Sequence, residues 1–333
     1  MSPWPLALAL LLAGCGEPSS AGGREPTRQG RFGSLRDFVL FERAPEEGGP
    51  FFLDRFEVTR SDWEEFEGRA TGGESSDLNG ALPMVGIDLH AARRFAAWRF
   101  ARLPRLDEWT FAATGGGKDR YPWGSVWRST CANCRDLGLA EPTPVGTFES
   151  GRKPSGPYDL VGNAAEWTET VPQDLLRLPE RSPPERIEDL NLMHWLVERS
   201  FGLAFWVRPW RPSPTLWLVA AVDERMPRLV VGGSYLTTMG QNPPPAEQLQ
   251  VARLPADLDP GTGLRLAADP VSILRALGRY ERPLSVEEDA LLRGFLRRPG
   301  HREALAAALA TLGDAPGGED RPVLSVLRSE LGR

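Results

Sequence analysis

Two acidic residues, Asp159 and Glu166, stand seven positions apart in the segment YDLVGNAAEW. Calcium is a hard cation that takes carboxylate and backbone carbonyl oxygens at about 2.3–2.6 Å. A cation would also offset the repulsion between two carboxylates held close together. The alternative is that both residues only cap turns, with Trp167 packing below them. We expect a calcium site in this loop.

The cysteines of the segment CANC, Cys131 and Cys134, have the spacing of redox and metal-binding pairs. One such pair without further Cys or His ligands is a weak signal. We therefore expect either a local disulfide, which a secreted protein permits, or two packed thiols.

The three histidines, His90, His194 and His301, are scattered along the chain without a paired motif. A non-haem iron centre needs two histidines and a carboxylate that share an open face. The sequence predicts no such centre, and surface or half-buried packing is the default for these residues.

The segment VVGGSYLTTMGQN (230–242) contains a Gly-Gly turn but no Cys, His, Asp or Glu. The glycines indicate a tight turn or a close backbone approach. Ser234 follows them, yet GGSY lacks the G-x-S-x-G spacing of a nucleophile elbow. Ser234 is expected to serve the turn or the floor of a groove.

The amino terminus predicts export and lipid anchoring. The apolar run 5–14 is too short to span a bilayer, and Leu12-Ala13-Gly14-Cys15 resembles a bacterial lipobox, although no Lys or Arg precedes the run. The signal segment 1–15 would be cut before Cys15, whose thiol would take a lipid. An ordinary signal peptide is the alternative. Residues 16–34 are predicted to form a flexible tether, which places the protein at the bacterial cell envelope, on its periplasmic or extracellular face.

Composition favours a loop-rich globular fold. The 333 residues carry 31 Pro, 35 Gly and 11 Trp, and the formal net charge of -6 predicts no nucleic-acid surface. Residues 35–58 predict a β-hairpin. Helices are predicted after Thr59 or Ser61, after Asp88 and after Leu106, and residues 263–268 predict a closing strand.

Two further segments are predicted in addition to the main domain. Residues 171–228 are predicted to be an insert, and residues 269–333 a small helical appendage. Asp269 and Ser285 are the expected N-caps in the appendage, the latter in a capping box.

An ordered set of motifs resembles the formylglycine-generating enzyme (sulfatase-modifying factor) family. They run from FFLDRFEVTRSDWEEF through ARLPRLDEWTFAATGG, YPWG and GPYDLVGNAAEWTET to VVGGSY and TGLRLAA, and the resemblance covers 35–268. It implies an irregular α+β fold related to C-type-lectin-like domains. It also implies calcium bound by the side chains of Asp159 and Glu166 and the carbonyls of Gly162 and Ala164. A second calcium site would use Asn133, although its acidic partner loop is shortened here.

The same resemblance implies that the family's catalytic cysteines are replaced in this chain. The two cysteines that bind Cu(I) and substrate in the family fall on Thr237 and Asn242, and neither side chain replaces a thiolate at a soft metal. Cys131 and Cys134 lie in a different segment and are not expected to stand in for them, so copper is not expected.

The sequence therefore favours a lipid-tethered, non-catalytic module that presents the groove near Ser234 to an exported protein, peptide or glycan. A divergent oxidase acting on an exported protein is one alternative. A protein-interaction scaffold is the other.

Overall fold

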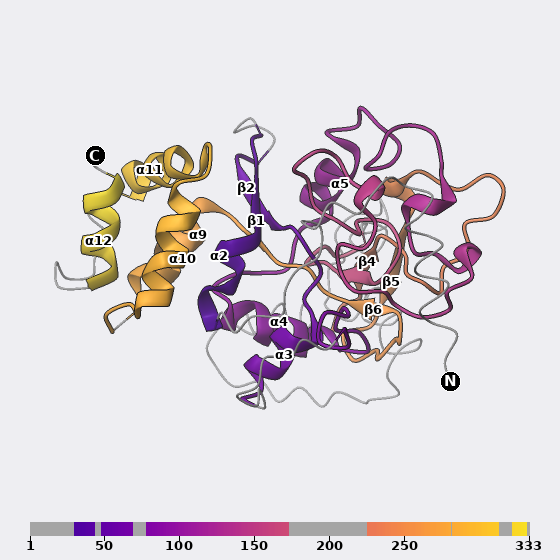
Figure 1. Ribbon diagram of the computed structural model, residues 1–333, viewed down its shortest axis with the longest axis horizontal. Helices are drawn as coiled ribbons and strands as arrows, with labels where there is room; N and C mark the ends of the chain where they lie inside the picture. Colours follow the sequence, from indigo (N-terminus) through magenta and orange to yellow (C-terminus); the bar gives the residue numbers. More distant parts are fainter. Residues whose placement is uncertain are drawn as a thin grey trace, which may run out of the picture.

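The computed structural model describes residues 30–43, 48–68, 78–172, 225–280, 282–312 and 322–331. Figure 1 shows a mixed part with sheets and irregular loops on one side and a group of helices, α9 to α12, on the other. The predicted signal segment 1–15 with Cys15, most of the tether and nearly all of the insert 171–228 lie outside the described residues. No helix in the described ranges is both long enough and apolar enough to cross a membrane.

A three-stranded antiparallel sheet joins the two parts. The predicted hairpin is confirmed, with Phe38 opposite Asp54 and Phe41 opposite Phe51. The second strand also pairs with a short strand near the end of the mixed part, where Leu53 lies opposite Ala267. The strands are β1 (Phe38–Phe41), β2 (Phe51–Asp54) and β7 (Ala267–Ala268), in the order β1-β2-β7.

A second, four-stranded sheet forms the other half of the mixed part. Its order is β5-β4-β3-β6, with a parallel pairing between β3 and β6. The prediction of a single strand over 263–268 is wrong, because β6 and β7 belong to different sheets and residues 264–266 cross between them. The strands are β3 (Ala165–Trp167), β4 (Arg228–Val231), β5 (Gln250–Arg253) and β6 (Thr262–Gly263).

The helices of the mixed part begin close to the predicted caps. Thr59 caps α3 (Arg60–Phe66) in a capping box with Asp62, and Asp88 caps α4 (Leu89–Trp98). The third helix is α5 (Leu106–Thr114). Short 3-10 helices lie in the loops: η3 (Ser129–Cys131), η4 (Arg135–Leu137), η5 (Glu149–Gly151) and η7 (Ala246–Gln248).

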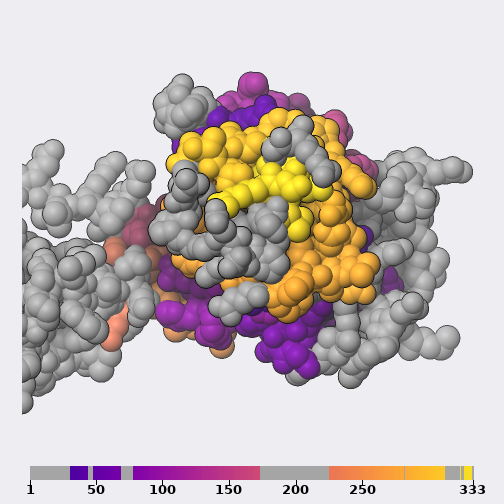
Figure 2. Space-filling view, turned by 90° about the vertical axis from the view of Figure 1, so that its left-hand side faces the viewer, coloured from indigo at the N-terminus to yellow at the C-terminus, as the bar shows by residue number. Residues whose placement is uncertain are grey.

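The C-terminal helices share one hydrophobic core with the mixed part. Phe295 packs on Phe52 of β2 at a ring distance of 5.1 Å, and His301 lies on the same ring at 5.1 Å. Figure 2 shows these helices, in orange and yellow, covering one end of the molecule. Asp269 and Ser285 act as the predicted N-caps. The helices are α9 (Pro270–Gly278), α10 (Val286–Leu296), α11 (His301–Leu312) and α12 (Pro322–Leu331).

The predicted tether 16–34 extends too far. The end of that range is structured as η1 (Gly30–Phe32) and the start of α2 (Gly33–Asp37). The reason is Phe32, which is fully buried between Phe100 and Tyr280 with edge-on ring contacts. One large aromatic side chain thus anchors the start of the folded region.

Candidate functional site

A cluster of charged side chains is buried at the centre of the mixed part. The guanidinium of Arg265 donates to one oxygen of Glu166, at 2.9 Å from Nε and 2.8 Å from Nη2. The other oxygen of Glu166 accepts a hydrogen bond of 2.9 Å from the indole nitrogen of Trp109. Arg265 also donates to the backbone carbonyls of Asp54 and Tyr158. Glu166 and Arg265 are 1% and 0% exposed.

Two further carboxylates, Asp159 and Glu57, belong to this cluster. Asp159 accepts a bond of 2.7 Å from the backbone N–H of Gly146. Glu57 accepts bonds of 2.7 Å from the side-chain amide of Asn163 and from the backbone N–H of Ala164. Burial is the main cause that raises the pKa of Glu57 well above its usual value and the pKa of Asp159 to about 6. Three buried carboxylates thus lie near one buried guanidinium.

The predicted calcium ligands converge on this cluster. Gly162 and Ala164 are buried, and their carbonyl oxygens accept no hydrogen bond from the described residues. Unpaired buried carbonyls beside an excess of carboxylate fit a divalent cation. However, Arg265 already occupies one oxygen of Glu166, and the described ranges contain no group of three or more His, Cys, Asp or Glu arranged to hold a metal. Calcium therefore stays a prediction.

Asn133, the residue predicted for a second calcium site, links three loops. Its amide nitrogen donates to the carbonyl of Glu141 at 2.9 Å and to Asn163 Oδ1 at 3.2 Å. Its own Oδ1 is buried and has no partner among the described residues. A free buried oxygen of this kind fits a cation, and the second site also stays a prediction.

The Gly-Gly turn after β4 is held by two hydroxyl groups. Gly232 has φ +87, and a Cβ there would lie 2.9 Å from the carbonyl oxygen of Leu160, so glycine is required. The backbone N–H of Ser234 donates to Thr237 Oγ1 at 2.9 Å, and Ser234 Oγ accepts from the N–H of Leu236 at 3.2 Å. Ser234 thus serves the turn, as expected from the sequence.

The candidate calcium loop contacts this turn directly. The N–H of Gly162 donates to the carbonyl of Gly232 at 3.0 Å, and the N–H of Tyr235 donates to the carbonyl of Asn163 at 3.1 Å. Asn163 has a positive φ of 60, which orients both its backbone and its amide for these contacts. The loop therefore fixes the position of the turn, and whatever stabilises the loop also stabilises the turn.

The CANC cysteines are free thiols in the structure, which agrees with the packed-thiol alternative and not with a disulfide. Cys131 contacts Ser150 Oγ at 3.6 Å. Burial is the main cause that raises the pKa of Cys134 to about 12. The CANC segment lies nearer to the Gly-Gly turn than the sequence suggested. The N–H of Arg135, directly after Cys134, donates to the carbonyl of Thr237 at 3.0 Å.

The two described histidines lie in different surroundings. His90 is exposed on α4, whereas His301 is buried at the start of α11 among Phe rings. His194 lies outside the described residues, so the absence of a histidine iron centre stays a prediction.

Sequence reasoning missed Glu57 and Arg265. Both lie in segments that otherwise read as apolar strands, FFLDRFEV and GLRLAA. A charged residue inside such a run is seldom buried unless it is paired. That rule could have nominated both residues as partners of the Asp159–Glu166 loop.

Comparison with known proteins decides the family. The description "Sulfatase-modifying factor enzyme 1-like domain" matches residues 41–270, which ends where α9 begins. The chain belongs to the sulfatase-modifying factor family. The α+β fold class predicted from the sequence is thereby confirmed.

Relatives in this sulfatase-modifying factor family differ in their described activity. The chain is 36% identical over 124 residues to the inactive C-alpha-formylglycine-generating enzyme 2 of Bos taurus, covering 33% of this chain and 39% of that protein. It is 28% identical over 219 residues to the formylglycine-generating enzyme of Mycobacterium tuberculosis, covering 60% and 62%. It is 31% identical over 104 residues to the hercynine oxygenase of Mycolicibacterium smegmatis, covering 30% and 24%. The matches thus span less than two thirds of these relatives.

Solved structures give only weak likeness. CarF is 18% identical with a TM-score of 0.41, and the match covers 69% of this chain and 94% of that chain. PvdO from Pseudomonas aeruginosa is 18% identical with a TM-score of 0.39, covering 69% and 91%.

The copper site that the family resemblance implies does not fit the residues present. Thr237 offers a hydroxyl oxygen that already accepts a hydrogen bond, and Asn242 is exposed. Hard oxygen and amide groups are poor ligands for Cu(I), which prefers thiolates. The side chains of Thr237 and Asn242 therefore offer no soft-metal ligand.

Proposed function

We propose that this protein is a non-catalytic binding module of the sulfatase-modifying factor family, held at the bacterial cell envelope by a lipid on Cys15. The surface around Ser234–Asn242 would receive an exported protein, peptide or glycan. Calcium bound by the Asp159–Glu166 loop would brace this surface.

The observation that carries the proposal is the hydrogen bond that the Thr237 hydroxyl accepts within the turn. This hydroxyl closes the turn by accepting a hydrogen bond from the N–H of Ser234, which gives a structural use to the position that the family resemblance assigns to a copper-binding cysteine. The similarity to an enzyme named as inactive supports the same conclusion. A fold that keeps its scaffold while its site changes is common.

Leu236 makes the surface next to the turn accessible to a test. It is 41% exposed directly after Tyr235, whose hydroxyl lies 3.5 Å from the carbonyl of Pro260. A single exposed leucine is ordinary on a protein surface, so it is used below as a probe of this surface. The turn itself is rigid because the loop at Gly162 and Asn163 holds it.

The alternative of a divergent oxidase rests on the active relatives, the formylglycine-generating enzyme and hercynine oxygenase. Copper analysis of the purified protein separates the two: we expect calcium without stoichiometric copper. Co-expression with a cysteine-containing sulfatase peptide tests the reaction, and the peptide mass should stay unchanged. Conversion of the cysteine to formylglycine would overturn the non-catalytic proposal.

The scaffold alternative places recognition on the insert or the C-terminal helices. Deleting 269–333 is an unsuitable test because these helices share the core with Phe52. Single surface changes are better: Leu236→Asp on the turn against Val286→Asp on α10, where Val286 is 89% exposed. If a captured envelope partner is lost only with Leu236→Asp, the turn is the recognition surface; loss only with Val286→Asp favours the scaffold.

A further inference from the structure

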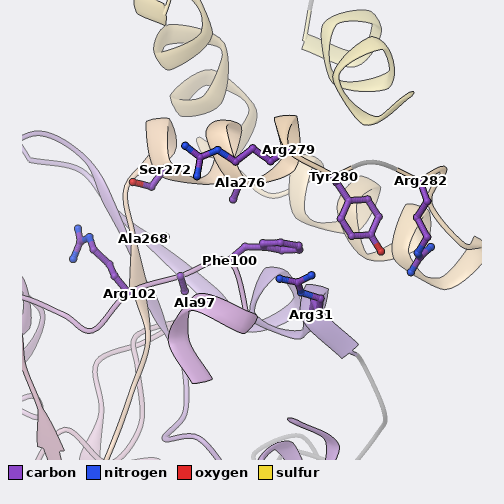
Figure 3. A pocket seen from close by; sticks show the side chains of 11 residues that line it. Arg31, Ala97, Phe100, Arg102, Ala268, Ser272, Ala276, Arg279, Tyr280 and Arg282 are labelled. Atoms are coloured by element: carbon purple, nitrogen blue, oxygen red, sulfur yellow. The ribbon is translucent and has the colours of Figure 1, made fainter. Parts of the chain in front are cut away.

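A cavity of about 680 Å³ lies between the mixed part and the C-terminal helices. It is bounded by the residues that follow α4, by the end of β7, and by α9 with the segment after it (Figure 3). This volume is typical of a pocket for a small organic molecule. The polar and aromatic side chains that line it are Arg31, Phe100, Arg102, Arg279, Tyr280 and Arg282.

Four arginines line the cavity, and two of them are held in place by carboxylates. Arg102 makes paired hydrogen bonds of 2.7 Å to both oxygens of Glu108, and its Nε lies 3.7 Å from Asp269. Arg282 is held by both oxygens of Glu288, at 2.9 and 2.7 Å. The carboxylates of Glu108, Asp269 and Glu288 therefore compensate the charges of these two arginines.

The other two arginines have no carboxylate partner among the described residues. Arg31 donates to the carbonyl of Trp98 at 3.0 Å and lies over the ring of Phe100 at 4.6 Å. The side chain of Arg279 is exposed and makes no ion pair or hydrogen bond within the described ranges. Among the described residues, none that lines the cavity is acidic. Two guanidinium groups without a carboxylate partner in the described ranges thus line the same cavity.

The aromatic side chains of the cavity are held in place. Phe100 has φ +55, a left-handed conformation that is unfavourable for a bulky residue. Edge-on contacts with Phe32 at 5.5 Å and Tyr280 at 5.8 Å retain it there. A helix that ends at this point would normally use glycine. The conformation places the Phe100 ring inside the cavity, as Figure 3 shows.

We propose that this cavity binds an organic phosphate with at least two negative charges. Guanidinium groups bind phosphate oxygens through paired, charge-assisted hydrogen bonds, and Arg31 and Arg279 have this capacity free. The space left beside a phosphate is lined by the Phe100 ring and by alanines, which suits a compact organic scaffold. The small residues are Ala97, Ala101, Ala268 and Ala276.

The phosphate could be carried by a soluble molecule or by a lipid headgroup, and the test separates these sources. The full chain is titrated calorimetrically at low salt with ADP and, in a second arm, with vesicles containing phosphatidic acid, whose phosphomonoester can carry two negative charges. Vesicles of zwitterionic phosphatidylcholine and adenosine are the probes without net charge, called the uncharged probes below. We expect ADP or the anionic vesicles to bind and both uncharged probes to fail, with affinity falling as salt rises.

The matched variants are Arg279→Gln and Arg275→Gln. Both residues are exposed, Arg275 on α9 and Arg279 directly after this helix, but Arg275 does not line the cavity. Losing one charge-assisted contact should raise the Kd about tenfold or more in Arg279→Gln, whereas Arg275→Gln should leave it unchanged. Arg31→Gln should weaken binding in the same way.

Three results would overturn the proposal. They are no binding by ADP and by the anionic vesicles, equal binding by the uncharged probes, and equal weakening by Arg275→Gln and Arg279→Gln. The last result would indicate only general surface charge. Binding by anionic vesicles alone, lost in Arg279→Gln, supports the site and identifies the lipid headgroup as the source. None of these results bears on the turn at Thr237.

Discussion

The guanidinium of Arg265 and the carboxylate of Glu166 form an ion pair that is almost completely withdrawn from water, with side chains 0% and 1% exposed and a closest contact of 2.8 Å. The two residues are separated by 99 positions. They connect the loop that carries the predicted calcium ligands to the chain segment that crosses between the two sheets. The pair therefore fixes the loop on which the Gly-Gly turn rests.

Removing one partner of this pair should be strongly destabilising. Glu166→Gln removes the carboxylate that contacts Arg265 directly and leaves only the more distant charges of Glu57 and Asp159. Breaking a buried pair typically costs about 3–5 kcal/mol. Denaturant unfolding of the variant should report a loss of that order. The control is Glu169→Gln, which breaks a half-exposed pair with Arg93 and should cost below about 1 kcal/mol. Equal losses would mean that burial of the Arg265–Glu166 pair is not decisive.

Calcium should stabilise the folded protein. A ligand that binds only the native state adds about 2.7 kcal/mol at a hundredfold excess over its Kd. After EDTA treatment, adding Ca²⁺ should raise the Tm, and Asp159→Asn should abolish the rise. Magnesium, which demands tighter octahedral geometry, is the control ion and should act weakly. An unchanged Tm on adding Ca²⁺ would show that Arg265 alone neutralises the cluster.

Local chemistry made parts of this fold predictable. Thr59, Asp88, Asp269 and Ser285 cap helices because a short polar side chain satisfies nearby backbone N–H groups, and this needs no distant partner. The β-hairpin could be predicted because its two strands are also close in sequence. Long-range relationships could not be predicted: the residues of 263–268 gave no sign that the chain passes from one sheet to the other. The exposed strand β5 was missed because its neighbourhood is polar and rich in proline.

The candidate site was likewise predicted where its residues are close in sequence and missed where they are distant. The Asp159–Glu166 loop was found because both carboxylates lie in one short segment. Glu57 and Arg265 were missed because their partners lie about one hundred positions away, where sequence spacing carries no distance information. The proximity of the CANC segment to Thr237 was missed for the same reason.

Restoring both family cysteines should restore soft-metal binding. In Thr237→Cys with Asn242→Cys, two thiols would stand on a turn whose backbone is already fixed by Gly232. Competition with a coloured Cu(I) chelator should show tighter copper binding than in the parent protein. The control is Thr237→Ser with Asn242→Ser, which adds no thiol and should match the parent. Equal copper affinity in both double variants would mean that the turn no longer has the metal-binding geometry.

Lipidation at Cys15 can be tested separately from the folded domain. In a bacterial host fed a labelled fatty acid, the parent protein should be labelled and sediment with membranes. Cys15→Ser should lose the label and leave the membrane fraction, because the modified thiol is absent. Cys131→Ser is the control, since this thiol is buried in the fold, and the label should remain. Retention of the label in Cys15→Ser would exclude this residue as the anchor.

His301 should make stability depend on pH near neutrality. Its ring lies between Phe52 and Phe295, and its nitrogens face the carbonyls of Pro299 and Phe38. Burial is the main cause that lowers its pKa below the ordinary 6.5. The unfolded chain therefore binds a proton at a higher pH than the folded protein, and stability falls as pH drops below about 6.5 until the lowered native pKa is passed.

The charged neighbours of His301 oppose one another, because Arg298 lowers its pKa and Glu303 raises it. The measurement is denaturant unfolding between pH 5 and 8, taken as the difference between the parent and His301→Gln. This difference removes the opposite contribution of Asp159, whose raised pKa favours the folded state at lower pH. His90→Gln, which alters an exposed histidine on α4, should keep the parent's pH dependence. If His301→Gln keeps it as well, the contact between α11 and β2 is not the source of the acid sensitivity.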